Sequence, residues 1–172
     1  FVIWSSDYLL KWSDFKAEHN ASIFEDSRST IQYRFTWTLN SDSKDGKIVF
    51  LIEDILLFVE FHPLLSSVRV SCDTDELLKH EQGHFDLAEL VKNENLEQFH
   101  KKFYNQIFPT RGKNEEQRKQ FAKEDSGKMI VSEIEKLSDL LQKRSEEYDI
   151  QTDFGQNQEK QKEFDLIFNE LR

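Results

Sequence analysis

Two histidines and a glutamate form the most informative pattern in the sequence. His80, Glu81 and His84 lie within the run His-Glu-Gln-Gly-His. In a helix, residues i and i+4 lie about 6 Å apart on one face, so both imidazoles can reach one zinc ion. Glu81 is offset by one position, where its carboxylate can accept a proton from zinc-bound water. The spacing therefore predicts two zinc ligands and a general base.

This combination is suited to the hydrolysis of peptide bonds. Zinc lowers the pKa of its bound water from about 15.7 toward about 7, and it polarises the carbonyl group that is attacked. The five-residue pattern is also a known metalloprotease signature. Gly83 within the pattern indicates a close approach by another segment, because glycine inside a helix costs about 1 kcal/mol relative to alanine.

A catalytic zinc site normally has three protein ligands, so one ligand lies outside the motif. Asp149, which directly follows a predicted helical stripe ending at Tyr148, is our preferred third ligand. Asp86 and Glu89 on the motif helix are alternatives. Glu89 would need a break in the helix to reach the metal, and both residues also suit the role of orienting a ligand histidine.

A long helix must carry the motif. The residues that recur at spacings of three and four are Leu77, His80, His84, Ala88 and Val91. This stripe predicts that both histidines face the core. We expect Asp73 to be the N-cap and Glu76 its capping-box partner. The helix should pass Phe99 and end before Pro109.

The segments before this helix predict a small, mostly antiparallel sheet. Apolar and polar residues alternate over 31–39, which is typical of a half-buried strand. Turn residues over 40–46 lead into a second strand at 47–52, so we expect a hairpin. Further strands are expected around 56–61 and 67–70.

The segments after the motif helix predict two more helices. The second helix should run from about Ser126 to Glu147, with Gly127 marking a break before it. Loop residues over 149–156 then precede a closing amphipathic helix. The apolar side of that helix carries Phe164, Ile167, Phe168 and Leu171.

The overall prediction is a single α+β domain over residues 1–172, mainly strands over 1–70 and mainly helices over 73–172. The net charge of -10 argues against nucleic acid and anionic membranes as partners. The longest apolar stretch, 48–61, is interrupted by charges and is shorter than the ~20 residues that span a bilayer. The lone Cys72 cannot form an internal disulfide.

Three runs of the chain resemble a bacterial family of predicted secreted zinc-dependent proteases, a domain of unknown function. These runs are Leu77–Glu89, Tyr148–Gly155 and Trp12–Phe15, and the extended motif His-Glu-Gln-Gly-His-Phe-Asp is the most specific part. The resemblance implies a zincin-like fold, a peptide or protein substrate, and a periplasmic or extracellular location. No signal peptide is recognised at Phe1, so we expect any targeting segment to have been removed.

The chain departs from this family in its tail motif. There the family has a Tyr-Asp pair followed by Glu, Thr and a His-Gly pair, whereas the Glu and His positions hold Gln151 and Phe154 here. If the family's third ligand is that histidine, either Asp149 or Asp153 replaces it or the metal site is weakened. Tyr148 is a candidate donor to a tetrahedral oxyanion, and a core-capping role is the alternative.

Three hypotheses follow from these patterns. The first is a zinc metallopeptidase in which His80, His84 and an acidic residue bind the metal and Glu81 is the general base. The second is a catalytically inactive zincin-like domain that binds metal or another protein. The third has no metal, treats both histidines as core residues and uses the charged helices as a partner surface.

Overall fold

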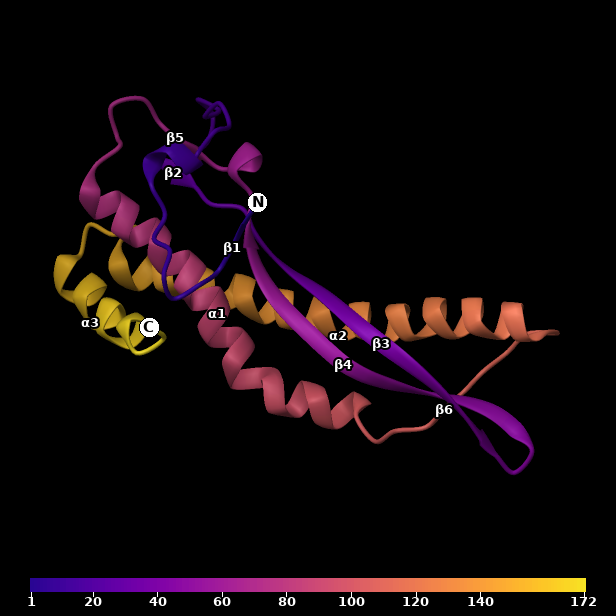
Figure 1. Ribbon diagram of the computed structural model, residues 1–172. Coiled ribbons are helices and arrows are strands. Elements are labelled where there is room, and N and C mark those ends of the chain that lie inside the picture. Colours follow the sequence, from indigo (N-terminus) through magenta and orange to yellow (C-terminus); the bar gives the residue numbers. More distant parts are fainter.

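The computed structural model describes residues 1–172 and has an α+β fold with three helices and two antiparallel sheets (Figure 1). The strands are β1 (Val2–Ile3), β2 (Ser27–Arg28), β3 (Ile31–Lys44), β4 (Lys47–Phe61), β5 (Ser67–Val68) and β6 (Phe108–Pro109). The helices are α1 (Asp75–Phe103), α2 (Glu115–Thr152) and α3 (Gln158–Asn169). The larger sheet has the order β1-β4-β3, with β6 also paired to β4, and β2 pairs with β5. None of the helices is both long enough and apolar enough to cross a membrane.

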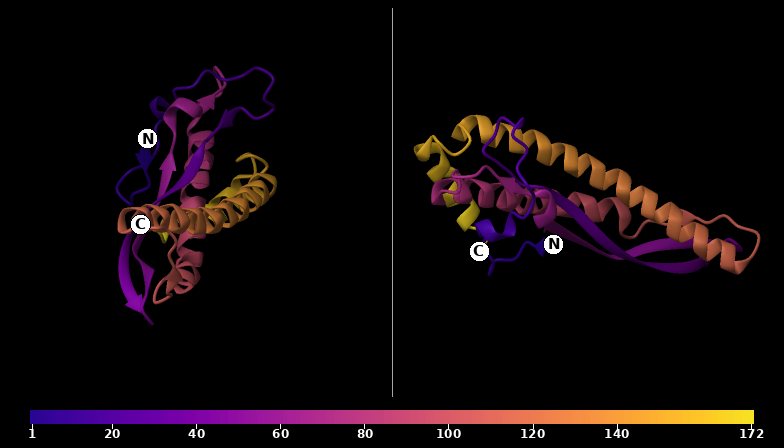
Figure 2. Two further views of the ribbon diagram at one scale, coloured as in Figure 1. Left: turned by 90° about the vertical axis from the view of Figure 1, so that its right-hand side faces the viewer. Right: turned by 90° about the horizontal axis from the view of Figure 1, so that it is seen from above.

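The predicted hairpin is present but longer than expected. β3 continues five residues past Leu39, and Asp45 and Gly46 make a tight turn at positive φ of 55° and 75°. Such residues are favoured in two-residue hairpin loops, whose twist matches that of the strands. The hairpin extends to one end of an elongated molecule, and α2 runs alongside it (Figure 2).

The prediction of two separate strands at 47–52 and 56–61 is wrong, because the single strand β4 runs through both ranges. A β-bulge joins them where the register with β3 shifts, and Asp54 adopts a positive φ of 50° there. The bulge frees backbone groups from the ladder. The Tyr104 hydroxyl accepts a hydrogen bond from the Ile55 amide at 2.8 Å and so satisfies one of them.

Helix α1 confirms the predicted inward stripe, since His80, Ala88 and Val91 are buried. Its N-cap is Thr74, whose side chain accepts a hydrogen bond from the Leu77 amide, so the predicted start was one residue early at Asp73. Helix α1 packs against β4, and Ala88 and Val91 of the stripe share a core cluster with Val59 and Phe61.

Helix α2 begins eleven residues before the predicted start at Ser126 and shows no break at Gly127. Its first three turns are highly charged and lack a clear apolar stripe, which is why the sequence pattern missed them. Contacts with the β3–β4 hairpin stabilise this first part of α2. The Trp37 indole donates to the Ser126 hydroxyl at 2.9 Å, and Lys123 lies 3.6 Å from the Trp37 ring centroid.

Two apolar clusters lie along α1. One surrounds the motif and includes Phe61, Phe85, Ala88, Val91, Tyr148 and Phe168. The other fills the hairpin end and includes Phe50, Ile52, Phe99, Phe103, Ile130 and Ile134. The motif is therefore anchored at one end of a helix whose other end has a core of its own.

A buried carboxylate fastens both ends of the chain to α1. Asp86 is 3% exposed and accepts hydrogen bonds from the Trp4 indole at 2.9 Å and the Gln82 amide at 2.9 Å. The Arg172 guanidinium donates to both of its oxygens, at 2.8 and 2.9 Å. Gln82 in turn accepts a hydrogen bond from the Leu10 amide at 2.7 Å. Two residues of the extended motif thus hold the fold together on the side of α1 away from His84.

We expect Asp86→Ala to lower the free energy of unfolding by about 3 kcal/mol, because removing one member of a buried ion pair leaves its partners unpaired. Urea unfolding followed by circular dichroism measures this. Glu97→Ala is the matched control on the same helix, since Glu97 pairs with Lys101 but is largely exposed. The control should change stability little, and equal effects of the two substitutions would contradict the role of Asp86.

Candidate metal centre

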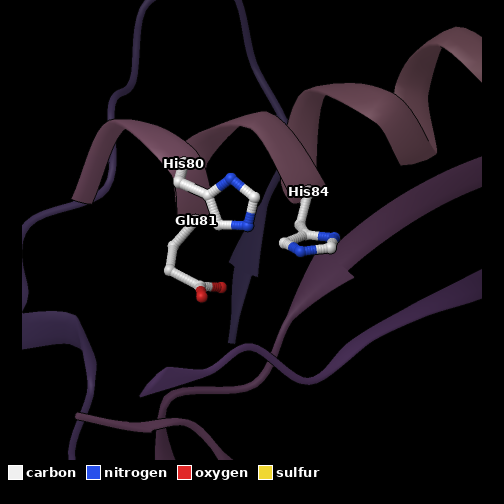
Figure 3. A group of neighbouring side chains, drawn as sticks. All are labelled: His80, Glu81 and His84. Carbon is white, nitrogen blue, oxygen red and sulfur yellow. The ribbon is translucent and has the colours of Figure 1, made fainter. Parts of the chain in front are cut away.

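His80, Glu81 and His84 extend from one stretch of α1 toward the same region, as Figure 3 shows. The potential ligand atoms of these three residues all lie within 4.8 Å of one another. His80 and Glu81 are buried, and the His84 side chain is 14% exposed. The group could hold a metal ion, because imidazole nitrogens and a carboxylate are suitable ligands for a divalent transition metal.

Asp149, near the end of α2, meets both histidines. Its Oδ1 lies 2.9 Å from Nε2 of His80 and 2.7 Å from Nε2 of His84. Burial by itself would raise the pKa of Asp149, but hydrogen bonding and attraction from the two imidazoles hold it well below its usual value. Burial lowers the pKa of His84, yet the hydrogen bond to Asp149 and the charge of Glu81 bring it above the ordinary value. The preferred third ligand therefore lies against both motif histidines.

The other acidic candidates lie elsewhere. Asp86 is committed to the Arg172 and Trp4 contacts described above. Glu89 pairs with Lys92 at 2.8 Å, one helical turn along α1. Asp153 is the exposed C-cap residue of α2 and does not line the cleft. Of the predicted acidic ligands, Asp149 is the one that contacts the histidines.

The orientation of the His80 ring is set by Gln161 of α3. The Gln161 Nε2 group donates to Asp165 at 3.0 Å and to the Tyr148 hydroxyl at 2.8 Å. Because an ionised carboxylate only accepts hydrogen bonds, Asp165 fixes which end of the amide faces it. The Gln161 oxygen therefore faces His80 Nδ1 at 2.9 Å and accepts its proton. Nδ1 therefore carries a hydrogen, and Nε2 is the ring nitrogen that faces Asp149.

Tyr148 packs directly on the motif. Its ring stacks on the His80 ring with centroids 4.6 Å apart and planes 9° apart. Its hydroxyl donates to the His80 carbonyl oxygen at 2.9 Å. Burial raises the pKa of Tyr148 far above its usual value. The residue is not among those that line the cleft, which argues against the predicted oxyanion role and favours the core-capping alternative.

Gly83 makes this packing possible. A Cβ atom placed on Gly83 would overlap the Tyr148 hydroxyl and lie 2.8 Å from its Cζ atom. It would also lie 3.1 Å from the Phe168 ring. The close approach expected from a glycine in the helix is therefore the approach of α2 and α3 to α1.

Glu81 is held by two serines that the sequence did not reveal. The Ser27 hydroxyl donates to Oε1 at 2.6 Å, and the Ser29 hydroxyl donates to Oε2. Both serines belong to β2 or the residues just after it, far from the motif in sequence. Gln161 was also missed, although a polar residue on the Phe164 and Phe168 side of a closing helix is a signal that could have identified it.

The centre opens into a cleft of about 1100 Å³, and most of the residues that line it are polar. The residues around its floor include His80, Glu81, His84 and Asp149. The walls come from residues 25–29, the start of β3, the segment before α1 and the end of α2. Of the candidate metal ligands, His84 and Asp149 are partly exposed to this cleft, whereas His80 is buried.

Comparisons with models of known families, with curated proteins and with solved structures gave no match.

We expect Gly83→Ala to destabilise the protein by about 2–3 kcal/mol, because the added methyl group forces α1 and α2 apart in a packed core. Gly127→Ala on α2 is the matched control. Its Cβ would lie 3.4 Å from the Trp37 ring, an ordinary contact, so helix propensity should stabilise that variant by up to about 1 kcal/mol. Thermal and urea unfolding measure both effects. A stabilising Gly83→Ala substitution would contradict the proposed constraint.

Proposed function

We propose that this protein is a zinc-dependent metallopeptidase with a zincin-like active site. The observation that carries the proposal is the meeting of His80 Nε2, His84 Nε2 and Asp149 Oδ1 at one point of an open cleft. The sequence resemblance to predicted secreted zinc-dependent proteases supports it and extends it to a periplasmic or extracellular location. A peptide or protein is then the substrate.

The residues present fit a zinc ion. With the Nδ1 proton of His80 engaged by Gln161, Nε2 faces a carboxylate oxygen at 2.9 Å. Two electron-pair donors this close attract one another only with a cation or an additional proton between them. Two imidazoles and one carboxylate form a ligand set used by catalytic zinc sites. The charges of Glu81 and Asp149 together also balance a divalent cation.

The two carboxylates have different roles in this proposal. Asp149 Oδ1 has the two histidine nitrogens as its hydrogen-bonding partners, so it is the third metal ligand. Glu81 is held at the side of the centre by Ser27 and Ser29, where it accepts the proton of the attacking water. A bound zinc ion would lower the pKa of that water and polarise the scissile carbonyl. Tyr148 and Gln161 fix the His80 ring.

One observation favours a second function, a metal-binding or protein-interaction domain without catalysis. Both oxygens of Glu81 already accept a serine hydroxyl, so its capacity as a base is partly engaged. The replacement of the family's tail residues by Gln151 and Phe154 points the same way. In this alternative the centre binds zinc for stability.

We expect the purified protein to contain one zinc ion per chain by elemental analysis and to unfold at a higher temperature when zinc is present. His84→Ala should abolish the stoichiometric zinc. Asp149→Ala should weaken zinc binding by more than about 100-fold in a chelator competition, since it removes a direct ligand. Asp153→Ala is the matched control and should bind zinc normally. Absence of zinc in the wild type after zinc is added back would overturn the proposal.

We expect Glu81→Gln to keep its zinc but to lose about 10²- to 10⁴-fold in kcat on a library of fluorogenic peptides, because the amide cannot accept the proton of the attacking water. Zinc content and thermal stability of the variant are measured on the same preparation. Unchanged turnover in a zinc-loaded Glu81→Gln protein would rule out the mechanism. A wild type that binds zinc but hydrolyses no peptide would favour the non-catalytic alternative.

A further inference from the structure

A strained aromatic residue lies at the candidate metal centre. Phe154 adopts a φ of 53°, between Asp153 at 49° and Gly155 at 89°. Left-handed backbone conformations are uncommon for bulky side chains and cluster at functional sites. The turn lets α3 fold back beside α1, and the Phe154 amide donates to the Asp149 carbonyl at 2.8 Å. Glycine or asparagine would fit this position with less strain, so the aromatic ring itself needs a reason.

Phe154 lines the cleft next to a proposed zinc ligand. The following residue, Gly155, lies so close to the motif that a Cβ atom placed on it would be 2.9 Å from Cβ of His80. The Phe154 ring is thus part of the wall beside the centre. Phe154 is one of the six hydrophobic residues among the 25 that line the cleft, so its ring adds apolar surface beside the centre.

A second aromatic ring extends this apolar surface. Phe24 is 86% exposed, and its ring meets the Phe154 ring edge to face with centroids 6.3 Å apart. Glu25 and Asp26 directly after it line the cleft, so Phe24 stands at the rim. An aromatic side chain this exposed contributes little burial to the stability of the fold.

The segment that carries Phe24 is fixed in place. The Arg69 guanidinium donates to the Ile23 carbonyl at 2.6 Å and to the Glu25 carbonyl at 3.4 Å, on the two sides of Phe24. Arg69 also forms an ion pair with Asp26 at 3.0 Å. Both rings of the pair are therefore held by their backbones, which favours binding because little ordering remains to be done.

We propose that Phe24 and Phe154 form an aromatic subsite that selects substrates with a large apolar or aromatic side chain beside the scissile bond. Aromatic rings pair edge to face or offset-stacked at centroid separations of 4.5–7 Å, so a substrate ring can add to the existing pair. Specificity then comes from this apolar surface, while the polar lining contacts the substrate backbone. The subsite rests on the proposed peptidase function.

The test uses two small zinc-binding compounds, N-acetyl-phenylalanine hydroxamate and N-acetyl-alanine hydroxamate, which differ only in a phenyl ring. Their dissociation constants on the zinc-loaded protein are measured by calorimetry. We expect the wild type to bind the phenylalanine compound at least about tenfold more tightly. Phe24→Ala and Phe154→Gly should reduce this ratio to below about threefold, and their zinc content should stay at the wild-type value.

Leu64→Ala is the matched control, because Leu64 is 77% exposed and lies outside the cleft. It should keep the full ratio. Phe154→Gly also distinguishes a role in binding from a role in stability. Glycine suits the left-handed backbone, so the unfolding temperature of this variant should not fall. A large fall would show that the ring serves the fold and would overturn the subsite.

The remaining outcomes separate the two proposals. A wild type without preference, or a preference retained in both aromatic variants, overturns the subsite even when peptides are hydrolysed. Preference for the phenylalanine compound in a protein that hydrolyses no peptide supports aromatic binding at Phe24 and Phe154, but it overturns the peptidase function and with it a role in selecting the scissile bond. Failure of both compounds to bind zinc-loaded protein overturns the subsite.

Discussion

The close approach of α1 and α2 at Gly83 is the constraint on which the candidate metal centre depends. Without a Cβ at this position, the Tyr148 hydroxyl reaches the His80 carbonyl and its ring lies flat on the His80 imidazole. Asp149 is the next residue of α2, so the contact made by Tyr148 sets the position of the carboxylate as well. A larger residue at Gly83 would separate the histidines from Asp149.

The hydrogen bonds behind His80 have a defined direction. His80 Nδ1 donates to the Gln161 oxygen, and Gln161 Nε2 donates to Asp165, whose carboxylate can only accept. A buried polar network stabilises a structure only when its members are satisfied, and this one occupies the interface of all three helices. The tautomer of His80 is therefore a consequence of tertiary packing, since Gln161 belongs to α3.

The sequence predicted His80, His84 and Asp149 from the apolar periods of two helices. The period of α1 placed His80 and His84 on the buried face, and the end of the apolar stripe at Tyr148 identified Asp149 as the nearest acidic candidate. Ser27 and Ser29 were not predicted, because a strand of two residues gives no periodic pattern in the sequence. Their contact with Glu81 depends on how β2 crosses α1, which local spacing does not encode.

The sequence predicted the elements whose buried residues recur at a simple period. It missed those that are stabilised by tertiary contacts without such a period. Alternation identified β3, but the bulge at Asp54 interrupted the pattern of β4 and divided one strand into two expected ones. The charged first turns of α2 carry no apolar stripe, and the Trp37 contacts that hold them come from the hairpin. Helices within proteins owe more of their stability to tertiary packing than to intrinsic propensity, so a segment without an apolar stripe is hard to recognise from sequence alone.

The two carboxylates at the centre illustrate how environment assigns chemistry. Glu81 and Asp149 lie beside the same pair of histidines, yet hydroxyl donors engage both oxygens of Glu81, whereas Asp149 Oδ1 faces two imidazole nitrogens. An ionised carboxylate has about four lone-pair sites, so two serine donors leave Glu81 able to take up a proton in the proposed mechanism. The register of α2 against α1 places Asp149 against the two histidines. In the proposed mechanism, Glu81 is the proton acceptor and Asp149 the metal ligand, the two roles that metal-assisted hydrolysis requires.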